Sequence, residues 1–261
     1  MINNFRSKGI CLENTVLYSD MPSSGISPDI KSWPSNFSLH HKEVTQQEIN
    51  SLGFRSDEFT DSHNDKHILF LGCSYTWGTG LYLDEVWSKI LYKEIKKSYN
   101  LSGYFSLGIP GDSIFSSIVN AFKYFKNFGN PDIIFFNVQD IERFYYLDKK
   151  DQKIFRANFK ENLLINLLAY QYYYMLEQYC IANKIKLVSF TWYLGHKDHA
   201  LKSFNSFYET DIDDISEYVA NYYNETSDEL SLLARDGKHL GKAYHQYWAD
   251  FIYDKFMIEA I

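Results

Sequence analysis

Residues 68–80 read ILFLGCSYTWGTG. The four apolar residues Ile68–Leu71 are typical of a short strand that is buried on both faces of a sheet. The rest of the stretch holds three glycines, as a tight turn requires, and a helix-like segment follows over residues 83–97. A strand, a turn and a helix in this order place one side chain at the carboxyl edge of a parallel sheet, where open α/β sheets bind ligands. We expect that side chain to be Ser74.

A candidate base for a serine nucleophile lies near the other end of the chain. Asp236 precedes His239 by three residues, just before a helix-like segment over residues 241–258. Serine chemistry needs a base that takes the hydroxyl proton and an acceptor that orients the base. The pattern therefore predicts a triad of Ser74, His239 and Asp236. The alternative is structural: Ser74 would bond its own turn, and the other two would cap the last helix.

Three short blocks follow one another in the order seen in one enzyme family. Residues 72–78 read GCSYTWG, where that family has Gly-Asp-Ser-Xaa-Thr-Xaa-Gly. Residues 108–113 read GIPGDS and match the glycine that follows its second strand. Residues 236–239 read DGKH and match its last block, Asp-Xaa-Xaa-His. On these blocks the chain resembles the SGNH (GDSL-type) hydrolases over residues 67–258.

The resemblance implies a fold and an oxyanion hole. The fold would be a three-layer α/β/α sandwich around a mainly parallel, flavodoxin-like sheet. The backbone N–H groups of Ser74 and Gly111 would bind the oxyanion. The third block is Gly-Xaa-Asn-Asp in the family and NVQD here, so Gln139 falls where the family has its Asn donor, with Asn137 as a substitute. Cys73, where the family has Asp, is expected to be a small buried residue.

The segments of the main domain alternate between strand and helix, which predicts βαβ units and a parallel sheet. We expect an N-terminal arm over residues 1–66 that packs on the main domain, and one hydrolase-like domain over residues 67–261. The expected strands are His67–Leu71, Tyr104–Leu107, Asp132–Asn137 and Lys186–Thr191, with a fifth that is short or comes from the arm. The expected helices are Leu83–Lys97, Ser113–Asn127, Asn158–Asn183 and Gly241–Ile258. Two insertions, 140–157 and 192–227, leave the carboxyl ends of strands and are expected to form substrate pockets or lids.

Three further residues are candidates for substrate binding. Arg55 precedes the first strand and could pair with an acidic substrate group, although a structural salt bridge is the simpler reading. Trp77 and Trp192 lie near the expected site and could stack on a sugar ring. Core packing is an equal alternative for both tryptophans.

Composition limits the partners of the chain. A net charge of -7 opposes general nucleic-acid binding, which needs clustered Lys and Arg. The three cysteines fit no metal motif and no histidine spacing suggests a metal, so neither a metal nor a cofactor is expected. No secretory signal and no membrane span are visible, which predicts a protein made in the cytoplasm. Later incorporation into a particle or complex stays open, as does the oligomeric state.

The resemblance implies a serine esterase that acts through an acyl-serine intermediate. A small, acetyl-like ester on a carbohydrate is the first substrate class, by analogy of fold alone. One alternative is a non-catalytic SGNH-fold protein that binds a partner or serves in a larger assembly. A second alternative is an acyltransferase that uses the same triad.

Overall fold

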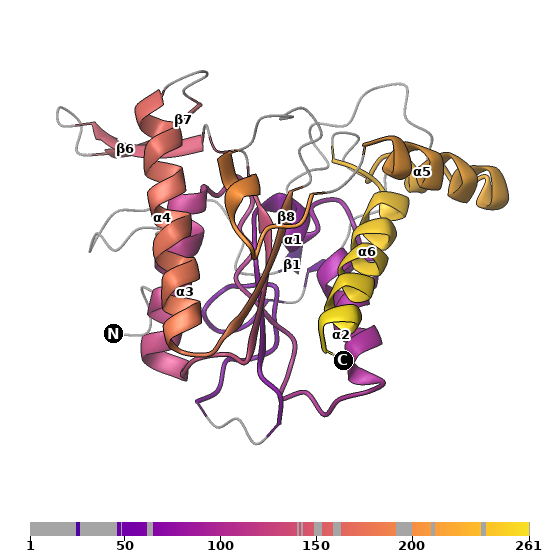
Figure 1. The fold of residues 1–261 in the computed structure, drawn as a ribbon. Helices are drawn as coiled ribbons and strands as arrows, with labels where there is room; N and C mark the ends of the chain where they lie inside the picture. The colour runs from indigo at the N-terminus through magenta and orange to yellow at the C-terminus, as the bar shows by residue number, and fades with distance from the viewer. Residues whose placement is uncertain are drawn as a thin grey trace.

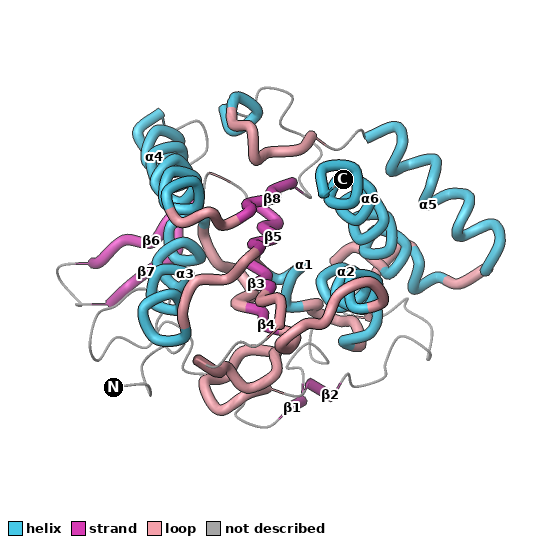
Figure 2. Tube along the Cα trace, turned by 60° about the horizontal axis from the view of Figure 1, so that its bottom comes forward, coloured by secondary structure: helices cyan, strands magenta, loops and turns pink. Residues whose placement is uncertain are grey.

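A four-stranded parallel sheet lies at the centre of the molecule, in the order β4-β3-β5-β8 (Figure 2). Its strands are β3 (Ile68–Leu71), β4 (Phe105–Ser106), β5 (Ile133–Val138) and β8 (Lys186–Thr191). The computed structural model describes residues 25–26, 46–47, 49–61, 65–139, 141, 143–148, 153–158, 163–191, 200–209, 212–235 and 239–260. When these four strands are numbered by their order in the chain, they lie side by side in the sheet in the order 2-1-3-4. This confirms the expected flavodoxin-like order.

Helices cover both faces of this sheet, which makes the expected three-layer α/β/α sandwich (Figures 1 and 2). The α-helices are α1 (Ser74–Trp77), α2 (Trp87–Lys96), α3 (Ile114–Phe128), α4 (Leu163–Ala182), α5 (Ile212–Thr226) and α6 (Lys242–Ala260). Short 3-10 helices are η4 (Leu83–Glu85), η5 (Ala200–Ser203) and η6 (Glu229–Ser231). α3 and α4 lie on one face, α2 and α6 on the other, and α5 packs outside α6. Among the described helices, none combines the length and the apolar composition that a bilayer crossing requires.

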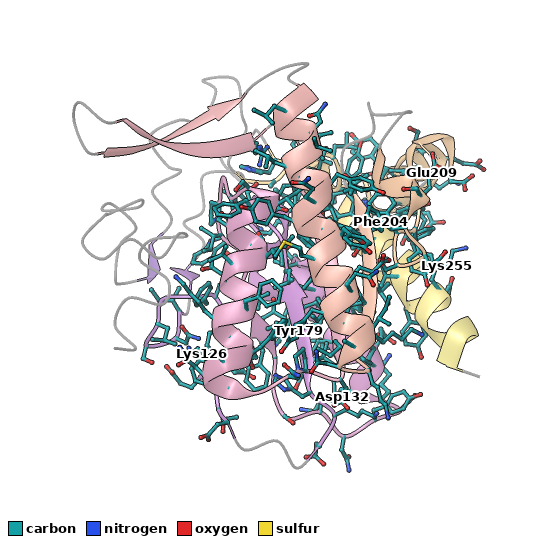
Figure 3. The ribbon with its side chains drawn as sticks, turned by 60° about the vertical axis from the view of Figure 1, so that its left-hand side comes forward. Lys126, Asp132, Tyr179, Phe204, Glu209 and Lys255 are labelled. Carbon is teal, nitrogen blue, oxygen red and sulfur yellow. The ribbon has the colours of Figure 1, made fainter. Side chains whose placement is uncertain are left out.

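The side chains of each strand alternate between two hydrophobic cores, as the two-residue period of a strand dictates. Leu69, Leu71 and Phe136 face α3 and α4, whereas Phe70 and Phe135 face α2 and α6. All five are fully buried, because helices close both faces of the sheet. The core on the α3–α4 side is rich in aromatic rings. Figure 3 shows two aromatic residues of this side, Tyr179 on α4 and Phe204 beside α4.

Beside β8, where a fifth strand would lie, the chain forms an isolated bridge instead of a full strand. Phe207 pairs in parallel with Ser189 of β8. The amide of Ser189 donates to the carbonyl of Ser206, and the amide of Tyr208 donates to the carbonyl of Ser189, each at 2.7 Å. The short alternative for the fifth strand is thus the one observed. The described strands of the arm, β1 (Gly25–Ile26) and β2 (Gln46–Gln47), pair only with each other.

Two expected elements differ from those observed. The helix expected over 83–97 is broken at Val86, whose extended backbone separates η4 from α2. The helix expected from Asn158 begins at Leu163, because Asn158 ends a strand. That strand, β7 (Lys153–Asn158), pairs antiparallel with β6 (Arg143–Asp148), so the first insertion contains a hairpin that the sequence reading missed.

The stretch of the arm over residues 49–61 packs against the main domain. Phe54 is fully buried in the α3–α4 core, and Phe59 makes an edge contact with Tyr124 of α3. The amide of Asp57 donates to the carbonyl of Tyr104 at 3.0 Å, and the amide of Tyr104 donates to Asp57 Oδ2 at 2.8 Å. This stretch therefore covers the outer edge of the sheet beside β4.

Candidate active site

The turn after β3 carries Ser74 at the start of α1. Gly72 has a φ of +154°, and a Cβ at this position would collide with the Thr76 side chain, so the tight turn requires glycine. Ser74 is buried with 7% of its surface exposed, and its hydroxyl lies 3.9 Å from Cys73 Sγ. As the first residue of α1, Ser74 has a backbone N–H that no helical carbonyl can accept. The turn thus offers both a hydroxyl and a nearby backbone donor.

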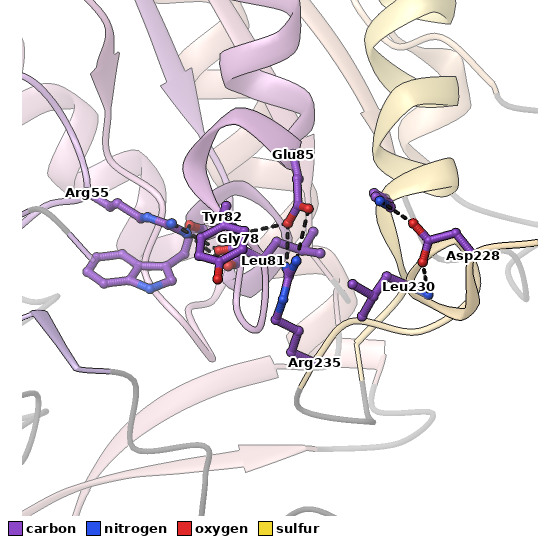
Figure 4. A network of polar contacts seen from close by, with 10 residues as sticks. Arg55, Gly78, Leu81, Tyr82, Glu85, Asp228, Leu230 and Arg235 are labelled. Atoms are coloured by element: carbon purple, nitrogen blue, oxygen red, sulfur yellow. Dashed lines mark hydrogen bonds and ion pairs between the residues drawn. The ribbon is translucent and has the colours of Figure 1, made fainter. Parts of the chain in front are cut away.

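Arg55 supports the far side of this turn. Its Nη1 donates to the carbonyls of Trp77 and Gly78, and its Nη2 donates to that of Leu81, all at 3.0 Å (Figure 4). The side chain is 2% exposed, and burial lowers the pKa of its guanidinium to about 10. Both terminal nitrogens of Arg55 thus bind backbone carbonyls, whereas its Nε has no hydrogen-bond partner among the described residues. A role for Arg55 in substrate binding stays a prediction.

The loop that carries His239 lies beside the Ser74 turn. Leu233 and Leu240 form an antiparallel bridge, and the amide of Ala234 donates to the carbonyl of His239 at 2.9 Å. The imidazole of His239 meets the ring of Tyr75 edge-on, with a centroid distance of 5.4 Å. Since Tyr75 follows Ser74 directly, the predicted base and nucleophile come to the same edge of the sheet. Asp236 lies outside the described residues, so its predicted role stays a prediction.

His245 of α6 has a structural role on the other side of Tyr75. Its Nδ1 accepts the amide N–H of Trp87 at 3.1 Å, which ties α6 to the start of α2. Burial, with smaller contributions from the neighbouring His239 and Arg55, lowers the pKa of His245 to about 3. His245 is therefore a neutral acceptor at ordinary pH.

The second block lies against α1 from the other direction. Its path is fixed by the amide of Ile109, which donates to the carbonyl of Gly72 at 3.3 Å. A Cβ at Gly108 would collide with the backbone of Trp77, so this loop and α1 touch. Gly111 has a φ of +76° and sits in the turn that precedes α3. This arrangement brings the predicted oxyanion glycine to the edge that holds Ser74.

Gln139 is directed at the start of α3. Its Nε2 donates to Ser117 Oγ at 2.5 Å, and Ser117 Oγ donates to Asp112 Oδ2 at 3.0 Å. Gln139 is fully buried, and its Oε1 has no partner among the described residues. In this arrangement its amide serves the Asp112 loop. Because Nε2 carries a second N–H, this bond leaves the role of Gln139 as an oxyanion donor a prediction.

Asn137, the substitute donor, lies two residues earlier in β5. It is fully buried, and neither atom of its amide has a partner among the described residues. Because side chains alternate along a strand, it shares the α2–α6 face with Phe135. Tyr75 lies on the same face. An unsatisfied buried amide costs free energy, so a group in this region that could bond it would be favoured.

Asp112 anchors the second block from within. Its Oδ1 accepts the amide N–H of Ser113 at 3.0 Å, next to the bond from Ser117. Burial raises the pKa of the Asp112 carboxyl to about 7, against the opposing effects of Ser117, Ser113 and the charge of Arg143. The group therefore titrates near neutral pH. The sequence reading did not single it out, although it sits inside the GIPGDS block.

The remaining candidates contribute less. Trp77 is 5% exposed, which leaves little of its ring open for a sugar, and Trp192 lies outside the described residues. Within the described part of the chain, no group of three or more His, Cys, Asp or Glu side chains could hold a metal ion.

The sequence reading also missed Glu85 and Arg235, which join the two halves of the site. The position of Arg235 directly before Asp236 was the available signal.

Comparison with known proteins finds similarity in structure only. No family model matches the chain, and no curated protein matches it. Among solved structures, the psychrotrophic esterase EstA from Pseudoalteromonas sp. is 12% identical, with a TM-score of 0.47 over 74% of this chain and 97% of that chain. The acetyl xylan esterase AlAXEase is 17% identical, with a TM-score of 0.43 over 74% of this chain and 99% of that chain. A GDSL-like lipase from Bacteroides thetaiotaomicron is 15% identical, with a TM-score of 0.37 over 75% of this chain and 89% of that chain. No residue of this chain takes a role from these similarities.

Proposed function

We propose that the chain is a serine esterase of the SGNH type, which hydrolyses a small, acetyl-like ester through an acyl-serine intermediate. The observation that carries the proposal is the position of His239, whose ring packs on Tyr75 next to Ser74 although the two segments are far apart in sequence. A histidine beside a serine at the carboxyl edge of a parallel sheet is the arrangement that serine acyl transfer uses. Esters carried by carbohydrates are the first substrate class to test.

In the proposed reaction, Ser74 Oγ bonds to the acyl carbon while His239 takes the hydroxyl proton. The tetrahedral intermediate collapses as the carbon–oxygen bond to the alcohol breaks, and His239 returns the proton to that alcohol. Water then attacks the acyl-serine with His239 again as base, which releases the acid and restores Ser74. Asp236 is the predicted partner that orients His239. The 3.9 Å contact of Ser74 with Cys73 is a resting arrangement, since catalytic hydrogen bonds often tighten only when substrate binds.

The proposed oxyanion hole consists of the N–H groups of Ser74 and Gly111. Gln139 donates one N–H to Ser117 in the structure, so the proposed third donor is either the second N–H of Gln139 Nε2 or the amide of Asn137, which has no partner among the described residues. The loss of one donor typically lowers the rate by about 10²–10³-fold. A two-donor hole therefore predicts a slow esterase rather than an inactive one.

Labelling with a serine-reactive fluorophosphonate tests the proposal. The wild type is expected to be modified at Ser74, as located by peptide mass spectrometry, whereas Ser74→Ala and His239→Ala are expected to remain unlabelled. Gln139→Ala is expected to keep its labelling rate within about threefold, because its amide serves Ser117 in the structure. Thermal melts of each variant show that it is folded. A panel of p-nitrophenyl esters and acetylated xylan then defines the substrate.

Two other functions are distinguished by the same protein samples. A non-catalytic binding or structural role is favoured by the engaged amide of Gln139, and it predicts a folded wild type that does not label. An acyltransferase labels at Ser74 but forms a new ester faster than free acid when an alcohol acceptor is added.

Location in the cytoplasm stays a prediction from the sequence.

A further inference from the structure

Arg235 reaches from the His239 loop to the segment that follows the Ser74 turn. Its Nη1 lies 2.6 Å from Glu85 Oε2 and its Nη2 lies 3.2 Å from Glu85 Oε1, so the pair is bidentate (Figure 4). The side chain of Arg235 is 5% exposed and that of Glu85 is 19% exposed. This ion pair is therefore largely removed from water and joins segments that are 150 residues apart in the sequence.

Both partners of this pair are held by further contacts. The amide of Tyr82 donates to Glu85 Oε2 at 2.8 Å, which fixes the carboxylate at η4. The ring of Tyr82 lies over the guanidinium of Arg235, 4.1 Å from its centroid. A planar guanidinium can bind a carboxylate with two donors and stack on a ring at once, which a lysine cannot do.

The backbone continues this connection to both catalytic segments. The amide of Arg235 donates to the carbonyl of Gly80 at 3.0 Å, directly after the Ser74 turn. Its neighbour Ala234 donates to the carbonyl of His239 at 2.9 Å. Only Ala234 thus separates the anchored arginine from the backbone of the proposed base.

Stability alone explains this pair poorly. The desolvation of a buried ion pair offsets much of its attraction, so such pairs are weak stabilisers compared with apolar residues of similar size. A bidentate, stacked pair does fix the relative position of the two segments that carry it. A misplacement of about 1 Å in an active site can lower a rate about 10²-fold.

We propose that Arg235 and Glu85 are positioning residues that hold the His239 loop against the Ser74 turn, so that the imidazole meets the serine hydroxyl. The proposal rests on the proposed esterase function. Neither residue touches the reacting atoms. Arg235 acts through the Ala234–His239 hydrogen bond, and Glu85 acts through Arg235.

The labelling kinetics of Ser74 test this proposal, measured well below the melting temperature of each variant. Arg235→Met is expected to lower the maximal rate of fluorophosphonate labelling about 10–100-fold, with the affinity for the reagent unchanged. Glu85→Gln is expected to lower it by a similar factor, and the double variant no further, because the two act as a unit. Arg235→Lys keeps the charge without the fork and should recover only part of the rate.

Lys242→Met is the matched control. Lys242 forms an ion pair with Asp228 in the same region, and both side chains are partly buried, at 25% and 32% exposure (Figure 4). Among the described residues, no hydrogen bond or ion pair joins this pair to the Ser74 turn, so the control should label within about twofold of the wild type. Equal rates in Arg235→Met and Lys242→Met would overturn the proposal, even if both variants melt at lower temperature.

Amide hydrogen exchange separates the failure of this proposal from the failure of the esterase function. Arg235→Met is expected to speed exchange about tenfold or more in peptides that cover residues 78–85 and 232–241, whether or not the protein labels. Glu85→Gln, the milder change, replaces Arg235→Met if the latter does not fold. An unlabelled wild type would refute the esterase function, whereas wild-type exchange in the Arg235 and Glu85 variants would refute the positioning role.

Discussion

At the scale of single residues, the site depends on which buried polar groups have partners. Asp112, Ser117 and Gln139 form one chain of donors and acceptors, whereas the amide of Asn137 has none among the described residues. An ionised carboxylate suits this chain, because Asp112 accepts from both Ser113 and Ser117. Burial opposes the charge and raises the pKa of Asp112 to about 7. The ionisation of Asp112, and with it the hydrogen bonding of the second block, therefore depends on pH.

Asp112→Asn is expected to change the pH dependence of stability. The unfolded chain titrates this carboxyl near 3.8 and the folded protein near 7, so the folded state binds more protons in between. The wild type thus loses free energy of unfolding as the pH rises from about 4 to about 7. Asparagine resembles the neutral acid, so its advantage in stability over the wild type should grow between pH 5 and pH 7 and stay constant above pH 7. Because one pKa unit corresponds to about 1.4 kcal/mol, a gain in melting temperature of at least about 3 °C is expected at pH 8.

Melting curves at pH 5, 6, 7 and 8 check this expectation. Asp84→Asn serves as a control, since the Asp84 side chain is 69% exposed. If the difference in melting temperature between the wild type and Asp112→Asn is the same at every pH, folding does not raise the pKa of Asp112.

At the scale of elements, local patterns in the sequence predict the central sheet well. The run Ile68–Leu71 and its parallel neighbours are buried on both faces, which the apolar pattern alone indicates. The β6–β7 hairpin was missed because Arg143–Asp148 and Lys153–Asn158 mix polar and aromatic residues without clear alternation. The charged residues between them were the turn signal that could have located it. The periodic pattern over residues 83–97 continued through Val86, whose extended backbone (φ -89°, ψ 133°) ends it in the structure.

Arg55→Leu tests how the arm supports the nucleophile turn. The change removes the donors to the carbonyls of Trp77, Gly78 and Leu81 in a buried place. Each buried acceptor left without a partner costs about 1–3 kcal/mol, and relaxation recovers part of this. We expect a loss of about 2–4 kcal/mol in the free energy of unfolding, measured by urea denaturation. Lys186→Leu, on the far end of β8 and only partly buried, is expected to cost less than about 1 kcal/mol. Equal losses in both variants would show that the three carbonyl bonds contribute little.

At the scale of the whole molecule, the site is made by contacts that no local pattern contains. Ser74 and His239 were predicted to meet from the chemistry that a serine nucleophile needs and from the resemblance to a family, since spacing within a helix or strand says nothing about such distant segments. The structure places their segments together through the Tyr75–His239 ring contact and the Arg235–Glu85 pair. The resemblance did not predict that pair, because it depends on side chains outside the shared blocks. The same limit applies to Gln139, whose partner Ser117 lies on α3.

The boundary of the main domain gives the last prediction. The sequence suggested an arm over residues 1–66 that packs on the main domain, and in the structure residues 49–61 supply a fully buried Phe54 and a buried Arg55 to that domain. The loss of a buried phenylalanine side chain alone costs about 3–5 kcal/mol, and a domain is stable by only about 5–15 kcal/mol in total. A chain that starts at residue 65 is therefore expected to lose cooperative unfolding when compared with a chain that starts at residue 49. Urea denaturation followed by tryptophan fluorescence measures this difference, with the full chain as reference. A cooperative transition at the same urea concentration in both shortened chains would show that the main domain folds without the Phe54 segment and begins where the sequence suggested.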